Sequence, residues 1–501
     1  MFEFLVLCIL SAKYVFCANI LYVSTVNSQS HQIWNRVLAL GLTEKGHNVT
    51  FMNIEKDEEQ FANWTHIYVE GPYKVLQSKF NLSDLIGSKG IQTVVWTVDI
   101  GIAVCEESLH SQGLQQLLNY PRNFKFDLII FDIIWGCCFC PLIHRFNYPP
   151  AIATTPWPVP SFLTHPFGTP LQSSHIPWYD LPYGEDMTLR ERFWNHIFTY
   201  SEIALKSRIT TKLQEKLVKT FGDDIPPLKK LERHISLLFS NHDVLLNYPQ
   251  ALTPNVIPVG GLHIASTKKL PKELQLVLDS AKNGVIVFSL GTIVRSDFLN
   301  KKIQRSLLDA FSELSEIVIW KFESEIDDVP KNVIVRQWLP QNDILGHPNV
   351  KLFIGHGGAL STQEAVYHGV PMICIPFFLD QNVHTARIVR EKLGLSLDYK
   401  EITTETVLIR IREVLNNPVY KENMKNLSKL YKDCKESPLD RALFWAEYAI
   451  RHNGCQILDS RSRDLPHYQT LSLDVLALFI ALGVVMFLLL YKIVNLLLGI
   501  F

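Results

Sequence analysis

The residues from Trp338 to Gln381 read WLPQNDILGHPNVKLFIGHGGALSTQEAVYHGVPMICIPFFLDQ and contain the clearest structural pattern in the chain. An apolar run at 351–354 predicts a short buried strand, which leads directly into the sequence GHGG at 355–358. A helix is expected to begin near Ser361. A strand, a glycine-rich turn and a helix in this order are typical of a parallel α/β sheet, which binds ligands beyond the carboxyl ends of its strands.

The same alternation of short β-branched runs and helical stretches continues on both sides of this segment. Further strands are expected at residues 20–23, 49–52, 126–131, 285–290, 317–321, 333–336 and 372–375. We therefore predict an α/β fold with two Rossmann-like domains that face a cleft. Prolines and glycines between 247 and 262 indicate the hinge, and the prolines between 149 and 182 predict an irregular region that shapes a pocket.

The residue types in the 338–381 segment suit a nucleotide sugar. Trp338 can stack on a flat base such as uracil, although a tryptophan alone would more often be a core residue. The amides of the GHGG turn, the positive end of the following helix, and the side chains of His356 and Ser361 can bind a diphosphate. Glu364 can accept both ribose hydroxyls, although alone it would fit an exposed helical position.

The segment ends in Asp380 and Gln381, which offer an acceptor and an amide to the hydroxyls of a sugar. The joint spacing of these residues resembles the signature of the UDP-glycosyltransferase family, which includes UDP-glucosyl and UDP-glucuronosyl transferases. The sequences VGGLH at 259–263 and FSLGT at 288–292 resemble the family's entry to the donor domain. The resemblance implies the GT-B fold, with the acceptor bound by residues 18–245 and the UDP-sugar by residues 246–435.

The resemblance also implies which residues bind the donor. In the family, the serine that matches Ser289 lies near the diphosphate, and Gly291 lets the backbone approach it closely. No metal is expected, because no Asp-x-Asp motif is evident, and the UDP-sugar is a co-substrate rather than a cofactor. The predicted donor-binding residues are Ser289, Gly291, Trp338, Gln341, His356, Gly358, Ser361, Glu364, Asp380 and Gln381.

His31 is the candidate general base, which a hydroxyl nucleophile needs near neutral pH. It follows the first predicted strand at the start of the first helix and therefore faces the cleft, although a histidine there could also simply meet solvent. A carboxylate would fix its tautomer and stabilise the imidazolium. Asp132, which ends the strand at 126–131, is the candidate; Asp127 competes but would lie at the opposite end of the sheet. The family has a catalytic histidine and aspartate in matching contexts.

We expect a single displacement with inversion, in which a hexose moves from the UDP-sugar to a hydroxyl of a small lipophilic acceptor such as a phenol or a steroid. The sequence looks closer to invertebrate members of the family, which favours UDP-glucose over UDP-glucuronic acid, and the resemblance implies a role in detoxification. Two alternatives stay open: a UDP-sugar epimerase on the same fold, and a catalytically silent membrane-anchored protein that binds lipophilic ligands. Whether the chain forms a homo-oligomer also stays open.

Both ends of the chain carry apolar segments. Residues 1–17 predict a secretory signal peptide with cleavage near Cys17 or Ala18; a buried first strand is the alternative. Residues 475–491 contain no charge and predict a transmembrane helix before a short tail at 492–501; a buried core helix is the alternative. These signals predict a single-pass type I protein with lumenal domains, in which residues 436–470 pack back on the first domain. The resemblance implies the endoplasmic reticulum membrane, although the tail lacks the family's pair of lysines.

The charge balance of 48 basic and 49 acidic residues, with a pI near 7.0, argues against a nucleic-acid partner. The nine cysteines show no zinc-site spacing, and three of them crowd between 137 and 140 without a readable pairing. Acceptor triplets for N-glycosylation, which fit a lumenal location, begin at Asn48, Asn63, Asn81 and Asn426.

Overall fold

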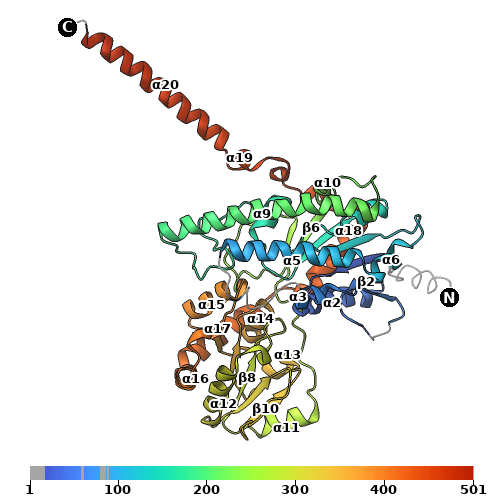
Figure 1. Cartoon of the computed structure of the whole chain (residues 1–501), viewed down its shortest axis with the longest axis vertical. Coiled ribbons are helices and arrows are strands. Elements are labelled where there is room, and N and C mark those ends of the chain that lie inside the picture. The colour runs from blue at the N-terminus through green and yellow to red at the C-terminus, as the bar shows by residue number, and fades with distance from the viewer. Residues whose placement is uncertain (1–16, 58–60, 79–85, 87–89, 500–501) are drawn as a thin grey trace, which may run out of the picture.

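Two α/β domains and a projecting helix make up the structure, a computed structural model that describes residues 17–57, 61–78, 86 and 90–499. Each domain contains one parallel sheet covered by helices, and the two domains lie one above the other (Figure 1). The predicted arrangement of two Rossmann-like domains is confirmed.

The first sheet has the strand order β3-β2-β1-β4-β5-β6-β7. β1 lies between β2 and β4, so that Ile20 is opposite both Val49 and Leu128. The chain order reverses between β1 and β4, and such a switch point opens a crevice beyond the carboxyl ends of the strands. The strands are β1 (Asn19–Ser24), β2 (Asn48–Asn53), β3 (Trp64–Tyr68), β4 (Leu128–Asp132), β5 (Ala151–Thr155), β6 (Ile235–Ser240) and β7 (Val256–Pro258).

Helices cover both faces of this sheet, because its central strands are apolar on both sides. α5 packs against the long α9 on the outside of the domain (Figure 1). Disulfides join Cys105 of α5 to Cys138, in the loop after β4, and Cys137 to Cys140. The helices are α2 (Gln29–Glu44), α3 (Pro72–Ser78), α5 (Ile91–Leu109), α6 (Gln112–Leu118), α7 (Pro141–Arg145), α8 (Ser161–Thr164), α9 (Leu189–Phe221) and α10 (Leu228–His234).

The second sheet has the order β10-β9-β8-β11-β12-β13, with a second switch point between β8 and β11. The strands are β8 (Val285–Ser289), β9 (Ile317–Lys321), β10 (Val333–Arg336), β11 (Val350–Gly355), β12 (Met372–Cys374) and β13 (Gly394–Ser396). The helices are α11 (Lys272–Ser280), α12 (Lys301–Ser312), α13 (Gln341–Leu345), α14 (Ala359–His368), α15 (Asp380–Arg390), α16 (Thr404–Asn416) and α17 (Pro418–Lys432).

Four strands of the first sheet differ from the sequence-based expectation. β5 and β6 were not predicted, and β5 lies inside the proline-rich region expected to be irregular, where it pairs with β4 and β6. β3 is an edge strand whose side chains are mostly exposed, so it lacks the apolar run that marks the other strands. β7 lies inside the segment predicted to be the hinge, yet it pairs with β6 from Leu238 to Ser240. The first domain therefore extends past the boundary that we placed at residue 245.

The C-terminal segment returns to the first domain before it leaves the globular part. α18 (Pro438–Arg451) packs on α2, where Ala442 and Ala446 join a buried cluster with Trp34 and Leu38. The close approach needs Gly41 on α2, because a Cβ there would lie 3.1 Å from Leu439 Cδ1.

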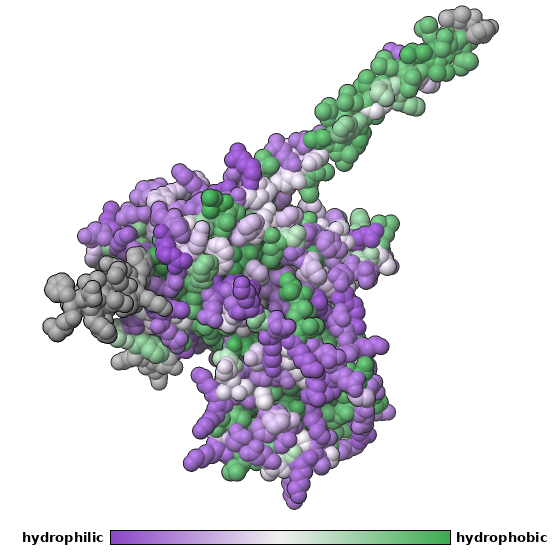
Figure 2. Space-filling view, turned by 180° about the vertical axis from the view of Figure 1, so that it is seen from behind, coloured by the Kyte–Doolittle hydropathy of each residue, from purple (hydrophilic) through white to green (hydrophobic). Residues whose placement is uncertain are grey.

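After α19 (His467–Thr470), α20 (Leu473–Leu498) projects away from both domains (Figure 1). Its apolar side chains form a continuous hydrophobic surface (Figure 2), its mean hydropathy reaches 2.8, and none of it is buried. Of the described helices, α20 is the one long and apolar enough to cross a membrane, and it includes the predicted span at 475–491. The predicted signal peptide lies outside the described residues except for Cys17.

Candidate active site

A large cavity lies between the carboxyl ends of the two sheets. It holds about 1720 Å³ of empty volume, counting its opening to solvent. Both domains line it, as expected for a ligand site at two facing switch points. Its walls include every predicted site residue except Asp132: His31, Ser289, Gly291, Trp338, Gln341, His356, Gly358, Ser361, Glu364, Asp380 and Gln381.

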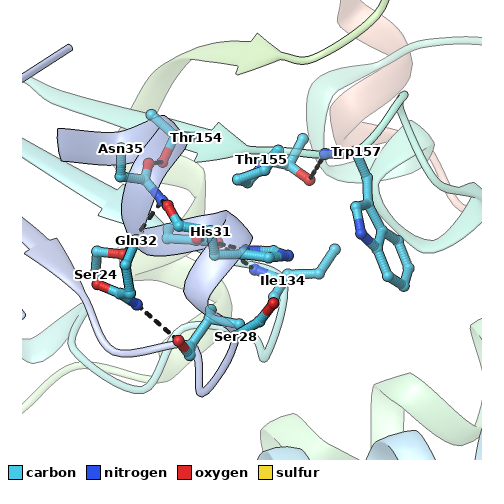
Figure 3. Close-up of polar contacts among 12 residues, drawn as sticks. Ser24, Ser28, His31, Gln32, Asn35, Ile134, Thr154, Thr155 and Trp157 are labelled. Atoms are coloured by element: carbon cyan, nitrogen blue, oxygen red, sulfur yellow. Dashed lines mark hydrogen bonds and ion pairs between the residues drawn. The ribbon is translucent and has the colours of Figure 1, made fainter. Parts of the chain in front are cut away.

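His31 and Asp132 form a buried pair at the floor of this cavity. The loop after β1 ends at Ser28, so His31 lies in the first turn of α2, while Asp132 ends β4. His31 Nδ1 lies 2.8 Å from Asp132 Oδ2, and the aspartate side chain is fully buried. Figure 3 shows the imidazole extending from α2 toward the side on which Trp157 lies. This contact fixes the ring so that its other nitrogen is free to face the cavity.

Asn35, one helical turn after His31, is a site residue that the sequence reasoning missed. Its Nδ2 donates to Asp132 Oδ2 (2.8 Å) and to the His31 carbonyl (2.9 Å). Its Oδ1 accepts hydrogen bonds from Tyr22 and Thr154. Asn35 therefore holds the same carboxylate oxygen of Asp132 that His31 contacts (Figure 3 labels Asn35 and His31). The i, i+4 spacing from His31 was the available signal.

Asp127, the competing carboxylate, lies at the far end of the sheet. It accepts a hydrogen bond from the Asn19 amide (2.9 Å) and pairs with Lys125. Since β1 and β4 run parallel, this position is separated from the cavity by the length of the strands. Asp127 therefore has no contact with His31.

The GHGG turn forms a cradle at the start of α14, and His356 lies at its centre. A Cβ on Gly291 would come within 2.6 Å of the His356 ring, and one on Gly358 within 2.4 Å. The two glycines therefore let the imidazole pack directly against backbone. Its Nδ1 is buried without a hydrogen-bond partner among the described residues. Burial, with the nearby His384 and Lys321, lowers the pKa of His356 to about 4, so the ring is neutral at physiological pH.

Glu364 and Gln341 form a second polar pair in the cavity wall. Gln341 Nε2 donates to Glu364 Oε2 at 2.6 Å. Burial raises the pKa of Glu364 to about 7, against the lowering effect of this hydrogen bond. The carboxylate is 14% exposed and lines the cavity, so it is not a solvent-facing helical residue.

Trp338 is a cavity residue rather than a core residue, because 53% of it is exposed. Lys321 Nζ lies 5.7 Å from the centre of its ring. The indole face is therefore open to stack on a planar group.

Asp380 and Gln381 begin α15, but they differ in whether their side-chain oxygens already accept hydrogen bonds. Gln381 is buried, and its Oε1 already accepts hydrogen bonds from the amides of Phe377 (2.8 Å) and Phe378 (3.4 Å). Asp380 Oδ2 lies 3.5 Å from His384 Nδ1 and borders the cavity. Gln381 thus stabilises the turn before α15, whereas Asp380 can still accept a hydrogen bond from a ligand.

Asp180, in the irregular region between β5 and α9, was not predicted; it does not line the cavity but holds Leu379, which does. Its Oδ1 accepts hydrogen bonds from the Leu379 amide and from Asn382, both at 3.0 Å, and its Oδ2 accepts one from Thr93. Asp180 therefore ties the turn before α15 to the first domain. No sequence signal marks it, because its partners are distant in the chain: Thr93 by 87 residues, Leu379 by 199 and Asn382 by 202.

The wall contributed by the first domain is apolar and aromatic. It contains Val26, Ile33, Ile100, Ile134, Trp135 and Trp157. Trp157 lies near the His31 ring, at 6.4 Å between centroids, and comes from the proline-rich region predicted to shape a pocket.

The predicted N-glycosylation sites differ in their exposure. Asn48 and Asn426 are exposed, whereas the Asn63 amide donates to the carbonyls of Thr43 and His47, and Asn81 lies outside the described residues. Within the described part of the chain, no cluster of three histidine, cysteine or carboxylate side chains could hold a metal ion.

The fold and the cavity define a glycosyltransferase of the GT-B class. Crystal structures share this fold: the calicheamicin glycosyltransferase CalG4 superposes with a TM-score of 0.58 over 87% of this chain and 99% of its own, at 16% identity. The spinosyn forosaminyltransferase SpnP does so with a TM-score of 0.57 at 17% identity, over 87% and 99%.

Sequence similarity is more specific. The family model for UDP-glucoronosyl and UDP-glucosyl transferase matches residues 29–499. UDP-glycosyltransferase UGT5 of Dactylopius coccus is 34% identical over 484 residues, 95% of this chain and 91% of that protein. UDP-glucuronosyltransferase 2B33 of Macaca mulatta is 32% identical over 397 residues, 78% and 73% of the two chains. The chain belongs to the UDP-glycosyltransferase family, and it is an enzyme that takes its sugar from a UDP-sugar.

Proposed function

We propose that the enzyme transfers glucose from UDP-glucose to a hydroxyl of a small lipophilic acceptor, with inversion at the anomeric carbon and with His31 as the general base. The observation that carries this proposal is the His31–Asp132 contact of 2.8 Å at the floor of a cavity that the donor-domain residues also line. A base and a nucleotide cradle at one cavity are what a direct displacement requires.

The proposed step is a single displacement. With Nδ1–H donating to Asp132, His31 Nε2 carries the lone pair that takes the proton of the acceptor hydroxyl. The hydroxyl oxygen then forms a bond to the anomeric carbon while the bond from that carbon to the UDP oxygen breaks. Asp132 stabilises the imidazolium, and Asn35 holds Asp132 in place. Attack opposite the leaving group converts an α-linked donor into a β-glycoside.

The donor domain supplies the binding of UDP. Trp338 stacks on uracil, the Glu364 carboxylate accepts the ribose hydroxyls, and the N-terminus of α14 faces the diphosphate. His356 and Ser361 donate to the phosphate oxygens as charge develops on the leaving group, with Ser289 on the opposite wall.

The charges that line the cavity support a neutral sugar. Lys321 is the sole lysine or arginine among the described lining residues, and its ammonium already donates to Glu323 (2.6 Å) and to the Gly291 carbonyl (3.0 Å). A glucuronate would therefore lack a cation, whereas the hydroxyls of glucose can donate to Asp380. UDP-glucosyltransferase 2 of Dactylopius coccus, 34% identical over 481 residues (92% of this chain, 89% of that protein), agrees with this choice.

The surfaces of the molecule support a proposal for the class of acceptor and for the cellular location of the enzyme. The aromatic wall around Trp135 and Trp157 suits a phenol or a steroid, and the role would be detoxification. α20 would anchor the enzyme in the endoplasmic reticulum membrane with its catalytic domains in the lumen. The Cys105–Cys138 disulfide fits that oxidising compartment.

The test is a panel of donors and acceptors with the full chain in detergent. UDP-glucose and UDP-glucuronic acid are each supplied with a phenol or a steroid, and UDP release and the anomeric configuration of the product are measured by coupled assay and NMR. We expect acceptor-dependent UDP release with UDP-glucose and a β-glucoside product. An α-glycoside would reject the direct displacement, preference for UDP-glucuronic acid would reject the donor, and conversion of the donor without acceptor would indicate an epimerase.

A further inference from the structure

A second cavity lies beside the active-site cavity, where the chain passes from the first domain to the second. We name it the connector cavity; its lining includes Val159, Ile176, Trp178, His242, Leu246 and Arg387. It holds about 860 Å³ of empty volume, counting its opening to solvent. Trp157 and Asp380 line both cavities and separate them, whereas His31 lines the active-site cavity alone.

Most of the connector cavity is apolar. Val159, Trp178 and Leu246 are buried core residues whose side chains reach its walls. Trp178 and Tyr179 pack with ring centroids 4.7 Å apart and present flat surfaces. These walls suit a compact apolar body.

One end of the cavity is basic, and some of the side-chain nitrogens there have no hydrogen-bond partner. His242 is 2% exposed, and neither of its ring nitrogens has a hydrogen-bond partner among the described residues. Arg387 donates from Nη2 to the Leu245 carbonyl (3.0 Å) and lies over the Tyr248 ring, but its buried Nη1 has no partner there. A buried polar group without a partner is costly, so these atoms indicate a ligand with acceptor oxygens.

No carboxylate among the described residues forms an ion pair with Arg387, although the charges of Asp243, Glu185 and Glu391 act on it from further away. Asp243 Oδ1 accepts the backbone amides of Leu245 and Leu246. Asp380, on the shared wall, pairs with His384 (3.5 Å). Burial and the charge of Arg387 lower the pKa of His242 to about 4, so the histidine itself is neutral. Arg387 therefore supplies the positive charge, and His242 a neutral N–H donor.

We propose that the connector cavity is a second ligand site, which binds a small lipophilic anion: an apolar body that carries one carboxylate, sulfate or sulfonate group. The oxyanion accepts hydrogen bonds from Arg387 and His242, and the apolar body contacts Val159 and Trp178. Since Trp157 and Asp380 separate this site from His31, its ligand is not the acceptor that is glycosylated. The inference does not depend on which sugar or acceptor the enzyme uses.

The test measures binding directly with naphthalene-2-sulfonate, which has no hydroxyl to glycosylate. The full chain in detergent, saturated with UDP, is titrated by calorimetry with this anion and with the neutral naphthalene-2-sulfonamide. We expect one site for the sulfonate and binding of the sulfonamide about tenfold weaker, the loss expected for one charge-assisted hydrogen bond. Absence of sulfonate binding, or equal affinity for both compounds, would overturn the proposal.

Variants locate the site. Arg387→Met should weaken sulfonate binding about tenfold and leave sulfonamide binding unchanged. Arg390→Met is the matched control, since this arginine also lies 5.3 Å from the Tyr248 ring but pairs with Glu185 and Glu391 and does not line the cavity. Val383→Phe, one helical turn before Arg387 on α15, fills the cavity and should abolish binding of both compounds. If folded Val383→Phe protein binds the sulfonate as the wild type does, the site lies elsewhere and the proposal is wrong.

Discussion

Replacing Gly358 by alanine should damage the diphosphate site without damaging the fold. The backbone at Gly358 has φ −66° and ψ 150°, which alanine adopts without strain. The added Cβ would lie 2.4 Å from His356 Nε2, so the ring must move by about 1 Å to reach an ordinary contact of 3.4 Å. The backbone of Gly291 lies against the same ring, so the imidazole must tilt out of its place.

That displacement would remove the proposed hydrogen bond from His356 to the diphosphate. A hydrogen bond to a charged group contributes about 1.5–3 kcal/mol, so UDP should bind roughly 10–100-fold more weakly. Uridine has no phosphate and should bind Gly358→Ala and wild-type protein equally in calorimetry. Gly483→Ala, in α20 with no atom within 4 Å of the new Cβ, is the control and should change neither affinity. Unchanged UDP affinity in folded Gly358→Ala protein would refute the assignment of the GHGG turn to the diphosphate.

Three further predictions concern other parts of the molecule. Burial raises the pKa of Glu364 to about 7, so the fraction of ionised carboxylate grows as the pH rises through that value. UDP affinity should therefore increase up to about tenfold from pH 6 to pH 8 in the wild type. In Glu364→Gln, UDP affinity should not change over this range. Asn35→Leu removes the hydrogen-bond donor to Asp132 (2.8 Å). It should lower kcat about tenfold in initial-rate measurements and leave the Kd for UDP unchanged in calorimetry. Equal losses in kcat and in UDP affinity would mean a general folding defect. Truncation after Leu471 removes α20 and should move the expressed chain from the membrane pellet to the supernatant with UDP affinity intact; continued sedimentation with membranes would reject α20 as the sole anchor.

The sequence predicted those parts of the structure that depend on local patterns. Strands β8 to β12 of the second sheet and the donor residues from Trp338 to Glu364 were predicted, because apolar runs and glycines act over a few residues, whereas the short β13 was not. The contact between His31 and Asp132 could be predicted from topology. β1 and β4 are parallel neighbours, so the segment that follows β1 and the last residue of β4 meet at the same edge of the sheet.

What the sequence did not predict depends on contacts between distant segments. β7 was assigned to the hinge because the prolines and glycines between 247 and 262 dominate the local pattern, and only its pairing with β6 places it in the first sheet. Asp180 and the disulfide between Cys105 and Cys138 join segments that no periodicity relates. The connector cavity likewise needs Arg387 and His242 from different elements, and neither residue stands in a motif.

A double-mutant cycle on His31 and Asp132 tests most directly whether the imidazole and the carboxylate act on the acceptor as one unit. kcat and the Kd for UDP are measured for wild type, His31→Ala, Asp132→Ala and the double variant. The account predicts that His31→Ala lowers kcat by about a hundredfold or more with UDP affinity intact, and that adding Asp132→Ala causes little further loss. Normal turnover in His31→Ala, or losses that simply multiply in the double variant, would contradict it.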